Sequence, residues 1–177
     1  MWYVVQVMSG QEHNIAQLCE VQLLQESEEV FIPMYQRKKK IRGKYELCQA
    51  ILFPGYVFFE TEEVEDLFYR LKDVQGLTRI LRTGEEFTPL HEKEVAFLSQ
   101  FGRKKHVVEM SVGYIEGDEV VITSGPMMDW SGKVKRIDRH KMIAVLEVEF
   151  FGRMTDVTVG LEIVEKRNDG KFEETLF

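Results

Sequence analysis

The sequence has few cysteines and no long apolar run. Only two of its 177 residues are cysteines, Cys19 and Cys48, and they lack the short spacing of metal-binding motifs. Cys19 falls on the apolar side of a predicted helix, so we expect a buried structural thiol. No apolar stretch approaches the length of a membrane span, and no basic segment precedes the apolar residues at the N-terminus, as it would in a signal peptide. We expect a cytoplasmic protein without metal, cofactor or membrane contact.

Catalytic motifs are missing as well. The sequence contains no HExxH, no Gly-x-Ser-x-Gly and no P-loop. Ser124 belongs to a Ser-Gly-Pro turn and not to a nucleophile elbow. The four histidines are scattered along the chain: His13, His91, His106 and His140. We therefore expect a protein that is not an enzyme and works by binding.

The charge is acidic overall but unevenly distributed. A net charge of −7 at pH 7 argues against a general binder of polyanions. Basic residues are nevertheless concentrated in three short segments, 37–44, 103–106 and 133–141. On an acidic protein such segments indicate targeted phosphate contacts, although each could equally be a solvated hairpin or linker.

Strand and helix patterns alternate over the first hundred residues. Residues rich in aromatic and β-branched side chains predict strands at 2–8, 30–32, 56–59 and 77–81. Helices are predicted over 9–23, with Ser9 and Glu12 as a capping box, from Thr61 to Gly76, and from Thr88 to Phe101. The basic segment 37–44 is expected at the tip of a long hairpin. This order predicts an α+β sandwich, an antiparallel sheet flanked by helices.

The remaining residues predict a second, all-β domain. Five short strands are expected at 120–122, 132–137, 142–148, 155–159 and 161–164, which should curl into a small barrel. Residues 103–116 show no sustained period and are expected to be a linker. The predicted organisation is therefore a first domain over 1–102, this linker, a barrel over 117–166 and a polar tail over 167–177.

Two stretches in this order resemble the NusG family of transcription elongation factors. Leu52-Phe53-Pro54-Gly55-Tyr56 resembles the Phe-Pro-Gly-Tyr strand of the family's N-terminal NGN domain. The strand and Gly-Pro turn at 117–126, followed by Gly132-Lys133-Val134, resemble its KOW domain. The resemblance covers residues 2–166 and implies an NGN sandwich linked to an SH3-like KOW barrel.

The resemblance implies that the NGN domain docks on the clamp helices of the largest RNA polymerase subunit and suppresses pausing. Its aromatic docking surface corresponds to Phe53 and Tyr56, since aromatic side chains supply buried area at interfaces. Of the alternating Phe58 and Phe59, at least one should be a core residue. The family's second helix faces the non-template DNA strand, and here it offers Tyr69, Arg70 and Lys72.

The KOW resemblance implies a protein partner. Phe150-Phe151-Gly152-Arg153 resembles the family's Ile-Phe-Gly-Arg turn, whose exposed aromatic residue, here Phe151, contacts ribosomal protein S10 or the termination factor Rho. The chain departs from the family after Gly125-Pro126, where Met127 replaces the usual Phe, and this departure bears on partner choice near the tip.

A further resemblance concerns the basic segment 136–141. Together with residues 76–82 and 159–164 it resembles the specialised LoaP branch of NusG paralogs, antiterminators that recognise a hairpin in the nascent RNA. The implied RNA surface comprises Lys104, Lys105, Lys133, Lys135, Arg136, Arg139, His140 and Lys141. We therefore expect a monomeric, operon-targeted antiterminator. Two alternatives remain: a general NusG-type factor that couples polymerase to Rho or ribosomal protein S10, and a ribosome-associated KOW protein that binds RNA.

Overall fold

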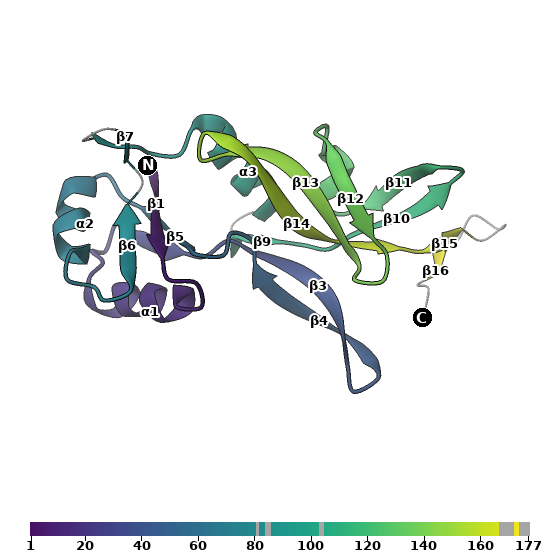
Figure 1. Ribbon diagram of the computed structural model, residues 1–177, viewed down its shortest axis with the longest axis horizontal. Coiled ribbons are helices and arrows are strands. Elements are labelled where there is room, and N and C mark those ends of the chain that lie inside the picture. The colour runs from purple at the N-terminus through teal and green to yellow at the C-terminus, as the bar shows by residue number, and fades with distance from the viewer. Residues whose placement is uncertain (81, 84–85, 103–104, 167–171, 174–177) are drawn as a thin grey trace. The chain divides into compact units, whose positions relative to one another are not determined.

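The computed structural model describes residues 1–80, 82–83, 86–102, 105–166 and 172–173 (Figure 1). The chain divides into two compact units. Unit 1 comprises Met1–Pro33 and Phe53–Leu98, and unit 2 comprises Met34–Leu52 and Ser99–Phe177. The basic segment 37–44, predicted as a hairpin, thus belongs to unit 2 together with the C-terminal part of the chain.

Unit 1 is built on a four-stranded antiparallel sheet. Its strands are β1 (Trp2–Val7), β2 (Glu29–Phe31), β5 (Tyr56–Glu60) and β6 (Leu77–Ile80), in the order β2-β5-β1-β6. Helices α1 (Glu12–Gln22) and α2 (Val64–Leu71) contribute to its core, and α3 (Glu92–Gly102) follows the short ladder of β7 (Arg82–Thr83) and β8 (Glu86–Phe87). The predicted mixture of antiparallel sheet and helices is confirmed.

The core of unit 1 joins one face of this sheet to α1 and α2. Alternate residues of β1 and β5 point to these helices, as the two-residue period of a strand requires. The buried members are Val5, Val7, Val57, Phe59, Ile15, Cys19, Leu67, Leu71 and Ile80. Burial raises the pKa of the Cys19 thiol to about 11, so the prediction of a buried structural thiol is confirmed.

The opposite face of the sheet carries a second aromatic group. The ring of Phe58 stacks on Phe31 at 5.5 Å between centroids and lies 5.9 Å from Phe53. Phe58 and Phe59 are both fully buried. The expectation that at least one of them is a core residue is confirmed.

Unit 2 contains the predicted small barrel as a curled five-stranded sheet (Figure 1). Its strands are β10 (Ser111–Glu116), β11 (Glu119–Ser124), β12 (Val134–Asp138), β13 (Ile143–Phe150) and β14 (Arg153–Ile163), in the order β11-β10-β14-β13-β12. A 3-10 turn, η2 (Pro126–Asp129), follows β11, and β15 (Glu165–Lys166) pairs with β16 (Phe172–Glu173). The predicted α+β fold class with a KOW-type barrel is confirmed.

The long hairpin predicted around residues 37–44 is present in unit 2. Strand β3 (Met34–Ile41) pairs with β4 (Lys44–Ile51) in a continuous antiparallel register. Its base also pairs in parallel with β9 (Val107–Val108). The hairpin is therefore anchored at one end and extends away from that anchor.

Three details differ from the sequence-based expectations. Residues 111–116, expected in the linker, form β10, because they pair with β11 and β14. The two strands expected at 155–159 and 161–164 are one strand, β14, which continues through Gly160. Helix α3 starts at Glu92 rather than at Thr88. Of the expected polar tail, residues 167–171 and 174–177 lie outside the described part of the chain.

Candidate functional site

A buried carboxylate holds the Pro-Gly turn that precedes β5. Glu12 is only 2% exposed, and its Oε1 accepts a hydrogen bond from the Gly55 N–H at 2.7 Å. Its Oε2 accepts one from the Gly10 N–H, also at 2.7 Å. Burial alone would raise the pKa of Glu12, but the bonds from backbone N–H groups outweigh it and lower the pKa.

This geometry corrects the predicted capping box. No side chain caps the start of α1, and Glu12 reaches Gly10 and Gly55 instead of the backbone of Ser9. Gly55 has a φ of +86°, a conformation that a glycine adopts without strain. Glu12 therefore fixes the turn that carries the predicted docking residues.

The two predicted docking residues differ in accessibility. Phe53 is 4% exposed because its ring packs against the core residue Phe58. It is thus a core residue in this structure, and its direct contact with a partner stays a prediction. Tyr56 is half-buried, and its backbone N–H donates to the Phe53 carbonyl at 3.3 Å. Tyr56 is the member of the pair that reaches the surface.

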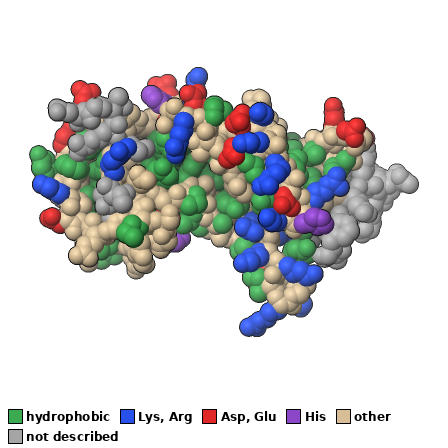
Figure 2. Space-filling model, in the orientation of Figure 1, with side chains coloured by type: hydrophobic (Ala, Val, Ile, Leu, Met, Phe, Trp, Pro, Cys, Tyr) green, Lys and Arg blue, Asp and Glu red, His purple; other side chains and the backbone are tan. Residues whose placement is uncertain are grey.

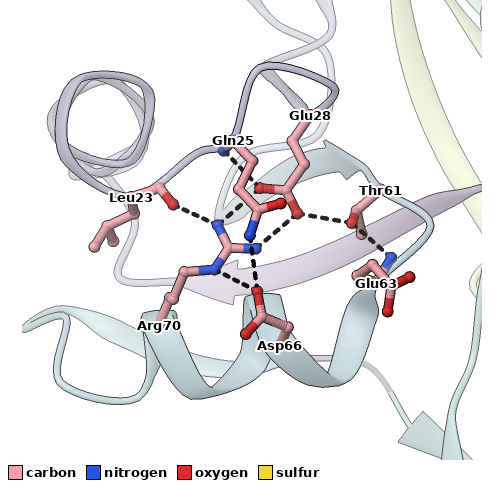
Figure 3. Close-up of polar contacts among 7 residues, drawn as sticks. All are labelled: Leu23, Gln25, Glu28, Thr61, Glu63, Asp66 and Arg70. Atoms are coloured by element: carbon pink, nitrogen blue, oxygen red, sulfur yellow. Dashed lines mark hydrogen bonds and ion pairs between the residues drawn. The ribbon is translucent and has the colours of Figure 1, made fainter.

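On α2, the guanidinium of Arg70 is held by acidic partners (Figure 3). It donates to both carboxylate oxygens of Glu28, at 2.7 and 2.8 Å. It also donates to Asp66 at 3.0 Å and to the carbonyl oxygen of Leu23. The donors of Arg70 thus serve the fold, and its contact with DNA stays a prediction.

Glu28 is the centre of this cluster. Its side chain is 3% exposed, and it also accepts hydrogen bonds from the Thr61 hydroxyl at 2.8 Å and the Gln25 N–H at 2.9 Å. Burial would raise the pKa of Glu28, but the bonds from Arg70, Gln25 and Thr61 prevail and lower it to about 2. The cluster therefore ties α2 to the segment between α1 and β2.

The other two predicted DNA residues lie on the surface of α2. Tyr69 is 69% exposed, and Lys72, at the C-terminal cap, is exposed as well. An exposed aromatic ring beside a lysine suits a single-stranded nucleic acid, because bases stack on rings and phosphates attract cations. Of the three predicted DNA residues, Tyr69 and Lys72 are therefore the most accessible.

The barrel presents most of the predicted RNA-binding residues at its surface. Three of the lysines face acidic neighbours: Lys135 lies 2.8 Å from Asp156 and Lys133 lies 3.3 Å from Glu147. Lys141 lies 3.9 Å from Asp138, whose Oδ1 accepts a hydrogen bond from the Lys141 backbone N–H at 3.0 Å. That bond lowers the pKa of Asp138.

The remaining cations of this surface form no such close pair, and Asp138 interacts with Arg136 and His140 only through its electrostatic field. Arg136 on β12 and Arg139 and His140 in the turn after it are exposed, and they form no ion pair with any residue that the structure describes. We call Arg139, His140 and Lys141 the basic turn. Lys105 is exposed too, whereas Lys104 lies outside the described residues.

A groove of about 520 Å³ lies between β11 and β12. These are the two outer strands of the five-stranded sheet. Apolar side chains line most of the groove, Trp130 borders it, and Arg136 and Lys135 bring positive charge to it. An aromatic and apolar groove with cations beside it can accommodate an unstacked nucleobase.

Phe151 occupies a tight turn between β13 and β14. Phe151 has a φ of +55° and Gly152 a φ of +68°, as in a type I′ turn. A bulky residue seldom adopts a positive φ. Phe151 is half-buried, with its ring 5.0 Å from the buried Phe150. The role of Phe151 in binding a protein stays a prediction.

The sequence did not indicate how the β3–β4 hairpin joins the barrel. The Lys38 Nζ lies 2.8 Å from a carboxylate oxygen of Glu162 on β14. Gly160 lies so close to β3 that a Cβ built on it would be 2.2 Å from the Gln36 carbonyl oxygen. No local pattern could have predicted this contact, because its partners are more than 120 residues apart.

In the part of the chain that the structure describes, no group of three or more His, Cys, Asp or Glu residues is placed to hold a metal ion. None of the helices in that part is long and apolar enough to cross a membrane.

Comparisons with known proteins cover nearly the whole chain. Residues 1–99 match the family model "Transcription termination factor nusG", and residues 116–149 match that of the KOW motif. The transcription termination/antitermination proteins NusG of Staphylococcus carnosus and Staphylococcus aureus are each 30% identical to this chain over 174 residues, covering 93% of it and 94% of their own length. The solved structure "Domain interaction in Thermotoga maritima NusG" has a TM-score of 0.52 and 25% identity, and the similarity covers 90% of this chain and 92% of that chain.

Proposed function

Because the chain belongs to the NusG family of transcription termination/antitermination proteins, we propose that it is an operon-targeted antiterminator that recognises a hairpin in the nascent RNA. It binds RNA polymerase at the clamp helices of the largest subunit and suppresses pausing and termination. It acts in the cytoplasm as a monomer, by binding and not by catalysis.

The polymerase contact rests on the turn before β5. Tyr56 lies half-buried at that turn, and Glu12 holds the turn through Gly55. A rigid aromatic residue with a polar hydroxyl suits a binding hot spot, because it buries area at little entropic cost. Tyr56→Ala should weaken polymerase binding and leave RNA binding intact. A loss of both would mean that Tyr56 supports the fold and not the interface.

The RNA contact rests on one observation above all: exposed cations are concentrated at β12 and the basic turn. Arg136, beside the groove, and Arg139 are exposed and form no close ion pair with a described residue. Cations follow the phosphate backbone, whereas selection among hairpins requires contact with unpaired bases. The groove bordered by Trp130 provides room for such a base.

The deciding experiment measures the affinity of the purified protein for leader RNA hairpins and for scrambled hairpins at physiological salt. We expect tight binding that favours one hairpin. Arg136→Ala combined with Arg139→Ala should weaken binding and reduce its salt dependence, since fewer counterions are released. Arg79→Ala with Lys93→Ala removes the same charge from exposed positions of unit 1 and serves as the control. Weak, unselective binding that vanishes with salt would overturn the proposal.

The conformation of Phe151 supports a second candidate, a general elongation factor that contacts Rho or ribosomal protein S10. The positive φ of this residue is a costly conformation for a phenylalanine, and such conformations are concentrated at binding sites. Phe151→Asn removes the ring and supplies a residue that tolerates a positive φ, so the turn should persist. If this variant loses binding to either protein while wild type lacks selectivity among RNA hairpins, the general factor is the better assignment.

Cosedimentation with ribosomes without polymerase binding would instead favour a ribosome-associated protein.

A further inference from the structure

The β3–β4 hairpin carries a dense positive charge to which the proposed function assigns no role. Residues 37–46 contain six Lys or Arg residues and a single acid, Glu46. Two of these cations serve the fold or lie partly inside it: Lys38 pairs with Glu162, and Arg37 is half-buried. The other four are exposed, and we call them the hairpin cations: Lys39, Lys40, Arg42 and Lys44.

The tip of the hairpin presents a cation in an unusual conformation. Arg42 and Gly43 have φ values of +50° and +86° and connect the paired residues Ile41 and Lys44, as in a two-residue type I′ turn. Asn, Asp or Gly is the usual residue at the first of these positions. An arginine there places a guanidinium at the end of the hairpin at some conformational cost.

The hairpin and the basic turn both approach the same strand, β14. Strands β13 and β10 pair with the two edges of β14. Gly160 of β14 pairs with Ile143 of β13, and its backbone closely approaches Gln36 of β3. The next two residues of β14 continue these contacts. Leu161 donates a hydrogen bond to the carbonyl of Met142, the residue that follows the basic turn, while Glu162 binds Lys38, the residue that precedes the hairpin cations.

This geometry joins two basic segments that are about a hundred residues apart in the sequence. Met142, the residue after the basic turn, and Lys38, the residue before the hairpin cations, contact adjacent residues of β14, Leu161 and Glu162. Figure 2 shows Lys and Arg side chains over the hairpin and over the adjoining strands of the barrel.

We propose that the β3–β4 hairpin is a second RNA-binding element, whose cations hold the stem of the RNA hairpin that the barrel recognises. The proposal rests on the RNA-binding function proposed above and extends it to a duplex. The barrel contacts the loop end of the RNA, and the hairpin follows the phosphates of the stem.

The length and the charge of the β3–β4 hairpin suit the binding of an RNA stem. From Gln36 to Arg42 the strand covers about 20 Å at roughly 3.3 Å per residue, which is enough to follow a backbone over several base pairs. Duplex RNA is bound mainly through phosphates, 2′-hydroxyls and shape, because its deep groove does not admit side chains. Flexible exposed lysines and arginines provide this kind of contact without reading the sequence.

The test compares a long-stemmed RNA hairpin with one that has the same loop and a truncated stem. The hairpin variant carries Arg42→Asn, which suits the positive φ, together with Lys44→Gln. We expect it to bind the long-stemmed RNA about tenfold more weakly, with a log–log salt slope lower by about one to two units. Its affinity for the truncated stem should match that of the wild type.

A matched control removes the same charge elsewhere. Arg79→Gln with Lys93→Gln changes two exposed positions of unit 1 and should leave both affinities unchanged. An equal loss in this control would assign the effect to net charge and overturn the proposal. Equal binding of the long stem and of a DNA duplex of the same sequence, with equal losses in the hairpin variant, would overturn the assignment to RNA.

The outcomes separate this proposal from the function on which it rests. If Arg136→Ala with Arg139→Ala weakens binding and the hairpin variant does not, the second element is wrong and the barrel site stands. If the wild type fails to distinguish loops but the hairpin variant still loses long-stem binding, the targeted antiterminator is wrong and the stem contact stands. If the wild type binds neither RNA, both are wrong.

Discussion

At the scale of single residues, burial decides which charged side chains are available for binding. Arg70 and Lys72 lie two positions apart on α2 and were both predicted to contact phosphates. The structure gives Arg70 four hydrogen bonds to protein acceptors and leaves Lys72 exposed. Two cations in nearly the same sequence context therefore have different roles, one in the fold and one at the surface.

Replacing each of these residues by alanine tests that difference. Arg70→Ala leaves Glu28 buried without its partner and should lower the free energy of unfolding by about 3 kcal/mol. Lys72→Ala should change it by less than about 0.5 kcal/mol, as usual for exposed positions. Urea denaturation at neutral pH measures both. Similar small changes for the two variants would contradict the role of the Glu28 cluster.

The stability of the protein should also depend on pH through Glu28. Its pKa is about 2 in the folded protein against an ordinary value of 4.5. The contribution of Glu28 to the free energy of unfolding is therefore complete above pH 4.5 and is lost as the pH falls towards 2. The pKa shift corresponds to about 3 kcal/mol of stability. Denaturation series between these pH values should show a steeper loss for wild type than for Glu28→Gln, which cannot titrate. If the free energies of unfolding of the two proteins change equally with pH, Glu28 is not the group responsible.

Among the strands, β14 shows how a glycine lets another strand, β3, come close to its backbone. A strand glycine usually weakens a strand, since it packs no side chain and gains more freedom on unfolding. Here Gly160 lies within β14, where an added Cβ would collide with the backbone of Gln36. The contact between hairpin and barrel therefore requires glycine at this position.

Gly160→Ala should accordingly destabilise the protein, by about 1–3 kcal/mol, as typical of overpacking in a close-packed interior. The control is Gly102→Ala at the end of α3, where the nearest atom to an added Cβ is 3.4 Å away. This replacement should be neutral or stabilising, because alanine favours the helix. Thermal unfolding of both variants gives the comparison. A stable Gly160→Ala protein would mean that β3 does not stay against β14 in solution.

At the scale of the whole molecule, an ion pair links segments that the sequence separates widely. Lys38 and Glu162 are 124 residues apart, and their side chains are only 19% and 7% exposed. Such a pair is weak evidence of net stability, but removing one partner leaves the other buried and unpaired. The pair therefore specifies the position of the hairpin against the barrel.

Lys38→Met should lower the free energy of unfolding by about 2 kcal/mol, since Glu162 loses its partner. Lys39→Met, at an exposed neighbouring position, is the matched control and should have little effect. Adding Glu162→Leu to Lys38→Met should recover part of the loss. Urea denaturation and hydrogen exchange of the β14 amides report the change. If Lys38→Met and Lys39→Met behave alike, the pair does not hold the hairpin.

Much of the fold could be predicted from local patterns. The alternation of strands and helices in unit 1, the buried face of α2 and the long hairpin follow from side-chain periodicity. Local patterns also led to errors. Glu12 looked like part of a capping box because of its spacing from Ser9, but its partner Gly55 lies 43 positions away. Strand β10 was missed because its residues show no sustained hydrophobic period, and only its pairing with β11 and β14 reveals it.

Residue order and local periodicity were enough to predict the family, the longer helices, most of the longer strands and the positions of the basic segments. The accessibility of the predicted residues depends instead on tertiary contacts. These contacts bury Phe53, engage Arg70 with Glu28, and bring β3 against β14. Each of these outcomes depends on contacts between residues far apart in the chain, and such contacts form only when the sheets pack and exclude water.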